Sequence, residues 1–585
     1  MAEDKLKKDY RKILRGLFAY LKTEWLMLLL SLGLLFAANL LALWGPRLSG
    51  QAVDAFGLGP NEVNVPLVLN RSLWMFASYA GSALLTYINA RLMVRVSQRI
   101  ISTMRQDTYN KILDLPLSYL DTHQAGDLVS RISYDLDVIN QSLTHDVIQI
   151  VASFITVVGS LWMMVSISWP LSIIFLALLP ITVLFTNYRI RKTRPLFRAR
   201  SKKLGEMNGY VEEVLYGQQT IRAYDKENFF SEEFYKINSD SIEAYYQADY
   251  QASVNMPSVT FISNLSIALV TTLGSLLFIS RGFSLGGLAA FILYARRFSG
   301  PINEISGIVA ELQSSLSAAE RVFKLLEQPS EPADRPGAIS LRNPEGRVEF
   351  KDINFEYIEG VPVIKDLSLS VEPGSLTAIV GPTGAGKTTL VNLLMRFYDP
   401  ISGTITIDGH DSREITRSSL RQSFAMVLQD TWLFKGTVRE NIAYGKPEAT
   451  MEDIERAAKA SHVHDFILSL EKGYDTEIED GASNLSQGQK QLLTIARAML
   501  LDTPMLILDE ATSNVDSRTE IYIQDAMNKL IEGRTSFVIA HRLSTIKNAD
   551  MILVMKDGDI REQGTHESLL EKGGIYAGLY TAQFE

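Results

Sequence analysis

The first half of the chain contains long stretches of apolar residues without a single charged side chain. About 20 apolar residues in a helix are enough to cross the hydrocarbon core of a membrane, where every backbone polar group needs a partner within the segment. Four charge-free stretches have about this length or more: Trp25–Trp44, Ser72–Asn89, Val147–Tyr188 and Gln251–Ser280. The third is long enough for two crossings, with a break predicted at Ser166–Pro170. Because a buried core of a soluble protein does not need so many charge-free segments, the pattern predicts a helical membrane domain.

A sixth crossing begins near Ser284 but contains polar residues. Arg296 and Arg297 follow Tyr294, and Pro301, after Gly300, is then expected to interrupt the helix. Ionisable residues at membrane depth mark a functional site by default, and the helix could unwind at the proline, as helices do near transport sites. Alternatively, both arginines lie at the cytoplasmic end of the span and extend their charged groups into water. The sequence leaves both interpretations open.

Basic residues indicate how the predicted helices are oriented. They concentrate in Arg91–Arg105 and Arg189–Lys203, and loops rich in Lys and Arg face the cytoplasm. With six crossings, both chain termini then face the cytoplasm as well. The N-terminal segment Met1–Lys22 is charged, so we expect an amphipathic helix at the membrane surface rather than a cleavable signal peptide.

Two of the predicted cytoplasmic connections are long and have a helical pattern. Arg91–Leu113 continues the second crossing, and Ser201–Gln247 connects the fourth to the fifth. Each reaches a tip with turn-forming residues, at Leu115–Asp127 and at Glu212–Arg222. The tips are either ordinary solvated loops or docking elements for another domain.

Beyond the membrane half (residues 1–327), the pattern changes at a segment rich in proline, glycine and charge. Residues 328–346 have the composition of a linker, and residues 347–585 alternate short apolar strands with helical patterns. This alternation predicts an α/β domain on a mostly parallel sheet. The predicted strands are Val348–Phe355, Leu376–Val380, Ser423–Leu428, Met505–Leu508, Ser536–Ile539 and Met551–Met555.

A phosphate-binding motif lies between the second of these strands and the helical pattern that follows. In a P-loop, backbone N–H groups surround a phosphate, the lysine reaches the β- and γ-oxygens, and the next hydroxyl ligates Mg²⁺. The nine residues of the motif are Gly381, Pro382, Thr383, Gly384, Ala385, Gly386, Lys387, Thr388 and Thr389. The chain is therefore expected to bind a nucleoside triphosphate with magnesium.

Five further residues lie where they can serve that nucleotide. Asp509 and Glu510 end an apolar strand, so the first can hold Mg²⁺ and the second can deprotonate an attacking water. Gln429 ends another strand, where its amide can contact both metal and water. His541 follows a strand and can donate to the γ-phosphate, although a packed core histidine is the alternative. Upstream, the ring of Tyr357 can stack on adenine.

Composition excludes several other kinds of chemistry. The chain has no cysteine, which rules out disulfides, thiolate catalysis and cysteine-bound metal. Its 46% of hydrophobic residues agree with a membrane protein, and its net charge of −9 does not favour nucleic acid as a partner.

With Asn484–Gln489 added, the chain resembles an ABC transporter, specifically an exporter half-transporter of six membrane helices fused to one nucleotide-binding domain. The resemblance covers nearly the whole chain. It implies that Ser486, Gln487, Gly488 and Gln489 form the signature motif, Ser513–Asp516 the D-loop, Tyr357 the A-loop aromatic, Gln429 the Q-loop glutamine and His541 the switch histidine. It also implies that the tips Leu115–Asp127 and Glu212–Arg222 lie at or beside two coupling helices. In this family the signature and Asp516 face the ATP on a partner's P-loop.

Two departures from the family pattern fall on the surface offered to the partner. Gln487 stands where glycine is usual, and Asn514-Val515 stand where Ala-Leu is common. The residues for the chain's own nucleotide have the usual types. This asymmetry resembles the catalytically complete half of a heterodimeric bacterial multidrug exporter, whose other half has a degenerate Walker B motif and a normal signature. Tolerated drift in a homodimer is the alternative.

The expected function is ATP-driven export of hydrophobic or amphipathic compounds by alternating access, in the cytoplasmic membrane. Alternatives are a homodimeric lipid or lipopeptide flippase, and an ATP-gated channel or sensor. The expected partners are a second half-transporter, membrane lipids and a small hydrophobic substrate. Aromatic and methionine residues in the predicted spans suit either a drug site or ordinary contact with lipid and neighbouring helices.

Overall fold

The computed structural model of the protein describes residues 2–57, 63–279, 283–429, 431–482, 484–509, 515–540 and 543–584. They divide into two compact units. One consists of Met1–Asp114 with Gln124–Gln328, and the other of Leu115–His123 with Pro329–Glu585. The short segment Leu115–His123 therefore belongs to the second unit, although its neighbours in the chain on both sides belong to the first.

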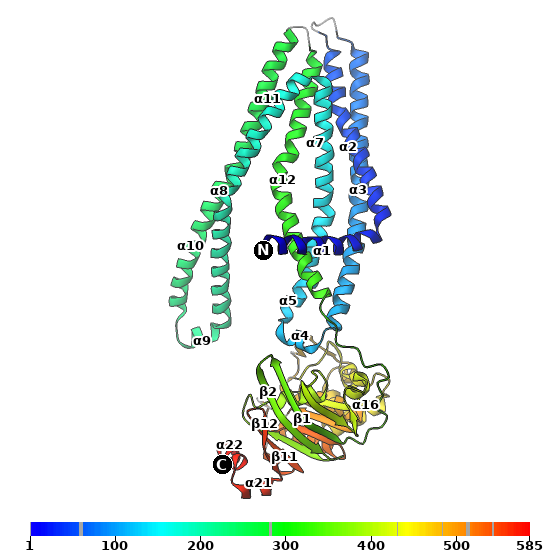
Figure 1. Ribbon diagram of the computed structural model, residues 1–585, viewed down its shortest axis with the longest axis vertical. Helices are drawn as coiled ribbons and strands as arrows, with labels where there is room; N and C mark the ends of the chain where they lie inside the picture. Colours follow the sequence, from blue (N-terminus) through cyan, green and yellow to red (C-terminus); the bar gives the residue numbers. More distant parts are fainter. Residues whose placement is uncertain are drawn as a thin grey trace. The chain divides into compact units, whose positions relative to one another are not determined.

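The first unit is helical (Figure 1). Its long helices are α2 (Trp25–Asp54), α3 (Val65–Leu113), α7 (Val147–Ile167), α8 (Trp169–Tyr216), α11 (Asn255–Ile279) and α12 (Leu285–Leu326). Within the described residues, three helical segments are long and apolar enough to cross a membrane by length and composition: Trp25–Asp54, Ala125–Ile167 and Thr260–Ile279. The other predicted crossings lie in α3, α8 and α12, which also contain charged segments.

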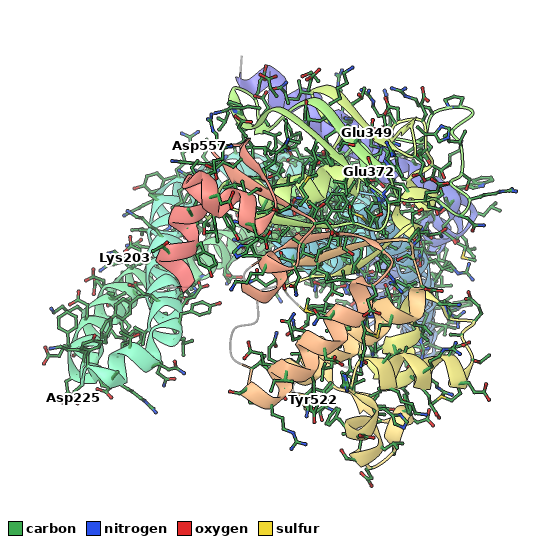
Figure 2. The ribbon with its side chains drawn as sticks, turned by 90° about the horizontal axis from the view of Figure 1, so that it is seen from below. Lys203, Asp225, Glu349, Glu372, Tyr522 and Asp557 are labelled. Carbon is green, nitrogen blue, oxygen red and sulfur yellow. The ribbon has the colours of Figure 1, made fainter. Side chains whose placement is uncertain are left out.

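Shorter helices complete this unit. They are α1 (Ala2–Thr23), α5 (Ala125–Ser130), α6 (Leu136–Gln141), α9 (Gln218–Ala223) and α10 (Glu227–Ser253), with π-helical turns at Arg131–Asp135 and Ser142–Asp146. The two predicted helical arms are present. α3 continues to Leu113, whereas α8 and α10 form a hairpin with α9 at its tip (Figure 1). Lys203 on α8 pairs with Asp240 on α10 at 3.0 Å, and Asp225 lies at the tip (Figure 2).

Three prolines behave differently in these helices. The predicted break before Pro170 is confirmed: α7 ends at Ile167 and α8 begins at Trp169. The suggested unwinding at Pro301 is wrong, because α12 continues through this residue to Leu326. Membrane helices tolerate proline when neighbouring groups bind the freed carbonyl oxygens. A third proline, Pro46 inside α2, shows such an arrangement directly and is considered below.

The second unit is an α/β domain with the short helix α4 (Leu117–Thr122). Its main sheet has the order β12 (Asp559–Gly564), β11 (Met551–Lys556), β3 (Leu376–Val380), β10 (Thr535–Ile539), β9 (Met505–Asp509) and β6 (Phe424–Val427). Every pair in it is parallel except β11 with β12. Five of the six predicted strands are thus present in this sheet within a few residues, and the sixth, Val348–Phe355, belongs to a second sheet. β12 was not predicted from the sequence.

A second, antiparallel sheet has the order β2 (Val361–Val371), β1 (Val348–Ile358), β4 (Ser402–Ile407) and β5 (His410–Asp411). Neither β2 nor β4 was predicted from the sequence. A small pair joins β7 (Gly436–Thr437) to β8 (Glu477–Ile478). The helices of the domain are α13 (Lys387–Leu394), α14 (Arg417–Gln422), α15 (Val438–Ile442), α16 (Met451–Ala460), α17 (His464–Ser469), α18 (Gln487–Leu501), α19 (Ser517–Ile531), α20 (Leu543–Lys547), α21 (His566–Lys572) and α22 (Ile575–Phe584).

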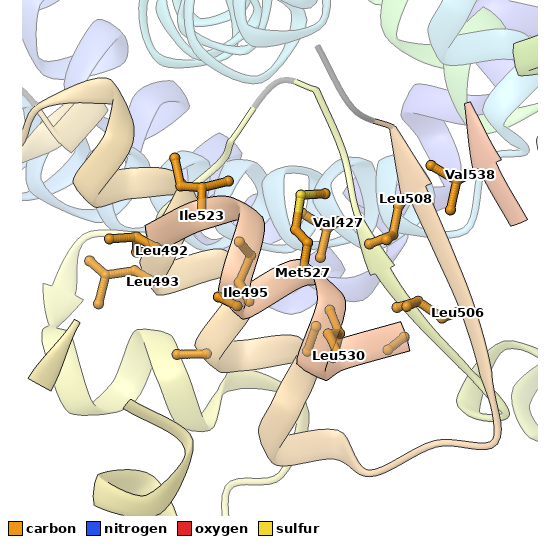
Figure 3. Packing of buried hydrophobic residues seen from close by; sticks show 14 of the residues in the cluster. Val427, Leu492, Leu493, Ile495, Leu506, Leu508, Ile523, Met527, Leu530 and Val538 are labelled. Atoms are coloured by element: carbon orange, nitrogen blue, oxygen red, sulfur yellow. The ribbon is translucent and has the colours of Figure 1, made fainter. Parts of the chain in front are cut away.

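The main sheet is covered on both faces, which explains why its strands are apolar without alternation. In β9, Leu506 and Leu508 point into one hydrophobic cluster, whereas Met505 and Ile507 point into another. The first cluster includes residues of α18 and α19, among them Leu492, Ile495, Met527 and Leu530 (Figure 3). The second cluster joins β1, β2 and β4 to α13. The carboxyl ends of the parallel strands are thereby fixed from both sides.

The segment predicted as a linker is held against the second unit by charged contacts. Glu331 receives two hydrogen bonds from the Arg421 guanidinium, at 2.5 and 3.2 Å. Asp334 binds both the backbone N–H and the guanidinium of Arg417. The chain is therefore anchored to α14 immediately after the boundary between the two units.

Candidate nucleotide site

The predicted P-loop connects a buried strand to a helix, as expected. All five residues of β3 are buried, and α13 begins at Lys387. A Cβ atom on Gly381 would lie 2.2 Å from the backbone oxygen of Met555. Gly386 has φ +99°, a left-handed conformation that side chains disfavour. Glycine at these two positions is therefore required by the fold of this domain itself.

Lys387 lies over this loop. Its ammonium group donates to the backbone oxygens of Gly381 at 2.8 Å and Pro382 at 3.1 Å. Burial lowers the pKa of Lys387, and the nearby Asp509 carboxylate acts in the opposite direction. The ammonium group and the end of β9 are therefore close enough to interact electrostatically.

The predicted metal ligands collect at one edge of the sheet. Leu508 pairs with Val427 in parallel register, so Asp509 and the segment leading to Gln429 emerge side by side. Asp509 also pairs with Ile539 of β10. Thr388 is exposed in the first turn of α13. A hydroxyl, an amide oxygen and a carboxylate suit Mg²⁺, which prefers oxygen ligands and retains several waters. Glu510 and His541, the predicted base and γ-phosphate donor, lie outside the described residues.

A cavity adjoins the loop. It has a volume of about 290 Å³ and is lined by Gly381, Pro382, Thr383 and Lys387 on the P-loop side. Ile546 of α20, with Tyr576 and Tyr580 of α22, contributes to its lining. The C-terminal helix therefore forms part of the surroundings of the P-loop, which the sequence motifs did not indicate.

Tyr357 is held in place by its hydroxyl group and its ring edge. The hydroxyl donates to Thr389 Oγ1 at 3.2 Å and accepts from Asn392 Nδ2 at 3.2 Å, both on α13. The rings of Phe355 and Tyr398 meet it edge to face, at centroid distances of 4.9 and 5.0 Å. The side chain remains 43% exposed, so it can offer a ring face to a base.

Tyr398 also connects this aromatic group to α4. Its hydroxyl donates to Asp121 Oδ2 at 2.6 Å. Burial, followed by this hydrogen bond, raises the pKa of Tyr398. The first predicted coupling tip thus contacts the side chain that packs on Tyr357. At the second tip, by contrast, Tyr216 and Tyr224 are 86% and 73% exposed.

The predicted signature residues begin α18. The Ser486 hydroxyl accepts from the Gln489 N–H at 3.3 Å, and the Gln489 side-chain oxygen accepts from the Ser486 N–H at 2.9 Å. This reciprocal capping box fixes the start of the helix. A Cβ on Gly488 would lie 2.5 Å from Thr519 Cγ2 and 3.1 Å from Val515 Cγ1. Gly488 is therefore required where α18 packs against the D-loop and α19.

Gln487 and Asp516 have partners within the same domain. The Gln487 side-chain amide donates to Thr431 Oγ1 at 3.3 Å, just beyond the Q-loop. Asp516 caps α19 by accepting from the Thr519 N–H at 3.0 Å, and this backbone hydrogen bond lowers its pKa. The D-loop residues Ser513 and Asn514 lie outside the described part of the chain. Thr431 and Tyr398 were missed because no motif includes them.

The strand-loop-helix geometry and the attached helical domain define an ATPase fused to a membrane domain. Family models identify it further: residues 28–302 match the ABC transporter transmembrane region, and residues 364–513 match ABC transporter. The chain belongs to the ABC transporter family. As an exporter-type half-transporter it couples ATP hydrolysis, with magnesium, to transport across a membrane, and such half-transporters work as dimers.

Two relatives whose names refer to lipid-like substrates, and one solved exporter structure, are similar to this chain over most of its length. A fatty acid ABC transporter ATP-binding/permease protein of Mycobacterium bovis is 46% identical over 86% of this chain and 79% of its own length. An ATP-dependent lipid A-core flippase of Chromohalobacter salexigens is 36% identical over 88% of each chain. The solved structure of a bacterial Atm1-family ABC exporter with ATP bound has a TM-score of 0.75 and 28% identity, covering 97% of this chain and 99% of that one.

Proposed function

We propose that this chain is the catalytically complete half of a heterodimeric exporter, which moves hydrophobic or amphipathic compounds out across the cytoplasmic membrane by alternating access. The observation that carries the proposal is a contrast within one nucleotide-binding domain. The residues for its own nucleotide have the usual types, whereas Gln487 and Asn514-Val515 depart on the side offered to the partner. The partner then supplies a normal signature and a degenerate Walker B motif.

The catalytic roles are assigned from residue types and their positions in the sequence motifs. Lys387 neutralises charge on the β- and γ-phosphates, and Glu510 deprotonates the attacking water. Thr388 and Gln429 would hold the magnesium ion, with Asp509 acting through water. When bound, this ion offsets charge that develops on the phosphates. His541 donates to the γ-phosphate, and the ring of Tyr357 stacks on adenine.

The contact between α4 and Tyr398 suggests how nucleotide binding reaches the membrane helices. A base stacked on Tyr357 restricts the ring that packs on Tyr398, whose hydroxyl is bound to Asp121. Because α4 lies between α3 and α5 in the chain, its displacement moves the ends of both. We therefore assign α4 as the coupling element on this chain's own domain, with the nucleotide-binding domain and both termini in the cytoplasm.

A homodimeric lipid flippase is the second candidate. The names of the relatives favour it, since one is described as a fatty acid transporter and another as a lipid A-core flippase. In a homodimer, Gln487 would have to be accommodated in both ATP sites. The departures at the signature and D-loop therefore argue against the homodimer but not against a lipid substrate.

The mass of the complex distinguishes the two assemblies. We would purify it from native membranes through a tag on this chain and determine its composition by native mass spectrometry. A 1:1 complex with a different half-transporter supports the heterodimer. A dimer containing only this 65.3 kDa chain contradicts it.

Catalysis is tested separately with Glu510→Gln. This substitution retains the shape of the side chain but removes the base, so we expect ATP turnover to fall by about 10²–10⁴-fold while ATP binding persists. ATP-dependent uphill movement of a compound into vesicles separates an exporter from an ATP-gated channel or sensor. Retained turnover in the variant would refute the assignment of Glu510.

A further inference from the structure

The carbonyl group freed by Pro46 in α2 binds an arginine in the middle of the membrane domain. A proline lacks the N–H that would bind the carbonyl four residues earlier, here Ala42. Arg297 Nη1 on α12 donates to the Ala42 oxygen at 3.0 Å. The Tyr294 hydroxyl, also on α12, donates to the Leu43 oxygen at 2.5 Å. Tyr294 is fully buried, so the contact belongs to the core between the two helices.

The depth of this contact follows from the outer ends of the same helices. There, Asp54 Oδ1 accepts from the Gly286 N–H at 2.7 Å, and a Cβ on Gly286 would lie 1.9 Å from the Gly50 oxygen. Arg297 is eleven residues further along α12, or about 16 Å at the rise of an α-helix. A hydrocarbon core is about 30 Å thick, so Arg297 lies near its middle rather than at the cytoplasmic end.

Arg296 projects from another side of α12 at the same depth. It is exposed, as are Leu293 one turn before it and Gly300 one turn after it. A Cβ on Gly300 would meet no atom within 4 Å, so this helix face borders open space. Arg47 on α2, four residues after Leu43, is exposed too. Arg47, Arg296 and Arg297 together are called the arginine cluster below.

The sequence offers almost no negative charge to balance this cluster. Residues 25–53, 65–106, 147–205 and 255–303 contain no Asp or Glu. The nearest carboxylate along α12 is Glu304, about two turns beyond Arg297, and its side chain lies outside the described ones. Charged residues at this depth are costly and face a water-filled cavity or the interior of the bundle. A counter-ion supplied by a ligand would offset this cost.

We propose that the arginine cluster binds the anionic headgroup of a transported amphiphile, a carboxylate or phosphate attached to an acyl chain. Arg296, whose side chain is exposed, supplies a guanidinium group that can bind two such oxygens at once, and Arg297 adds a second positive charge at the same depth. Arg297 uses one N–H for Ala42 and retains others for the ligand. Leu293, 39% exposed and one turn from Arg296, offers apolar contact to the chain of the ligand. This inference rests on the proposed export function and names the substrate class.

The test is equilibrium binding to the purified full transporter, measured by native mass spectrometry without ATP. The probes are oleate, its uncharged methyl ester and oleoyl lysophosphatidic acid. Wild type should bind the two anions about ten- to hundredfold better than the ester, the effect of charge-assisted hydrogen bonds. The ratio of the dissociation constants of oleate and oleoyl lysophosphatidic acid distinguishes a carboxylate substrate from a phospholipid.

Matched variants assign the effect to the cluster. Arg296→Gln should remove most of the preference for anions and leave binding of the methyl ester unchanged. Arg297→Gln should act similarly, whereas Arg297→Lys, which retains a charged donor for Ala42, should preserve the preference. Arg91→Gln removes a charge that contacts Tyr87 on α3 and serves as the control, with binding like that of wild type.

Equal binding of oleate and its ester by wild type would overturn the inference, as would an unchanged preference in Arg296→Gln together with Arg297→Gln. Either result can occur in a transporter that still hydrolyses ATP and moves a neutral compound. Failure of the proposed export function would instead appear as absent uphill transport by wild type, whatever the binding data show.

Discussion

The P-loop and the signature motif of this domain differ in which of their positions need glycine for the domain to fold. At the P-loop, Gly381 and Gly386 are fixed by close backbone contact and by a left-handed φ within the chain itself. At the signature, packing requires only Gly488, and the neighbouring Gln487 directs its side chain to Thr431. The single domain therefore folds with glutamine at position 487. A requirement for glycine there could only come from the partner's nucleotide.

The largest effect is expected from Lys387→Ala on the P-loop side. The ammonium group already lies over the loop, where it donates to Gly381 and Pro382. Losing it leaves charge on the phosphates uncompensated, so turnover should fall by at least about 10²-fold. Steady-state ATPase of the purified complex measures this, with an unchanged melting temperature as the control for folding. Turnover within tenfold of wild type would contradict the role of Lys387.

The next largest effect is expected on the stability of the complex, at Gly488 in the signature motif. Gly488→Ala places a methyl group 2.5 Å from Thr519 Cγ2, so α18 and α19 must move apart. Overpacking of this kind costs about 1–3 kcal/mol, and the melting temperature of the complex should fall. Gly578→Ala is the matched control, because its Cβ meets no atom within 4 Å in α22. If both variants melt like wild type, the packing constraint at Gly488 is absent.

A smaller effect, on ATP turnover, is expected at Gln487, the residue before Gly488. Gln487→Gly removes one hydrogen bond to Thr431 and leaves the capping box intact. In a heterodimer, position 487 faces only the degenerate site, so total ATPase should stay within about twofold. In a homodimer it faces both competent sites, and better backbone approach to the γ-phosphate should raise turnover by roughly tenfold. Thr431→Val releases the Gln487 side chain without removing it and serves as the comparison.

Local patterns in the sequence predicted much of this fold. The apolar runs predicted the parallel strands, and Pro170 predicted the break between α7 and α8. These succeed because a buried strand or a helix start depends on residues close in sequence. Pro301 misled because its effect depends on neighbours that sequence alone does not place. Arg297 and Ala42 are 255 residues apart, and Tyr398 and Asp121 are 277 apart. Such contacts depend on the folded structure, and no local sequence pattern predicts them.

The smallest effect on ATPase, yet the most informative about coupling, is expected from Tyr398→Phe. The P-loop side is connected to α4 through the hydroxyl of Tyr398, which binds Asp121 at 2.6 Å. Phenylalanine retains the edge-to-face contact with Tyr357 and removes only the hydroxyl, a loss of about 1 kcal/mol. ATP affinity and basal ATPase should stay within about twofold. Transport per ATP hydrolysed should decrease, because α4 then follows Tyr357 less closely.

A double-mutant cycle with Asp121→Asn determines whether the two side chains act together. If the hydroxyl and the carboxylate function as one contact, the double variant should lose no more transport per ATP than either single variant. Tyr224→Phe, at the exposed tip beyond α9, makes the same chemical change away from this contact and is the matched control. Additive losses, or an equal loss in the control, would mean that Tyr398 only anchors α4. The signal from the nucleotide would then have to reach the membrane helices by another route.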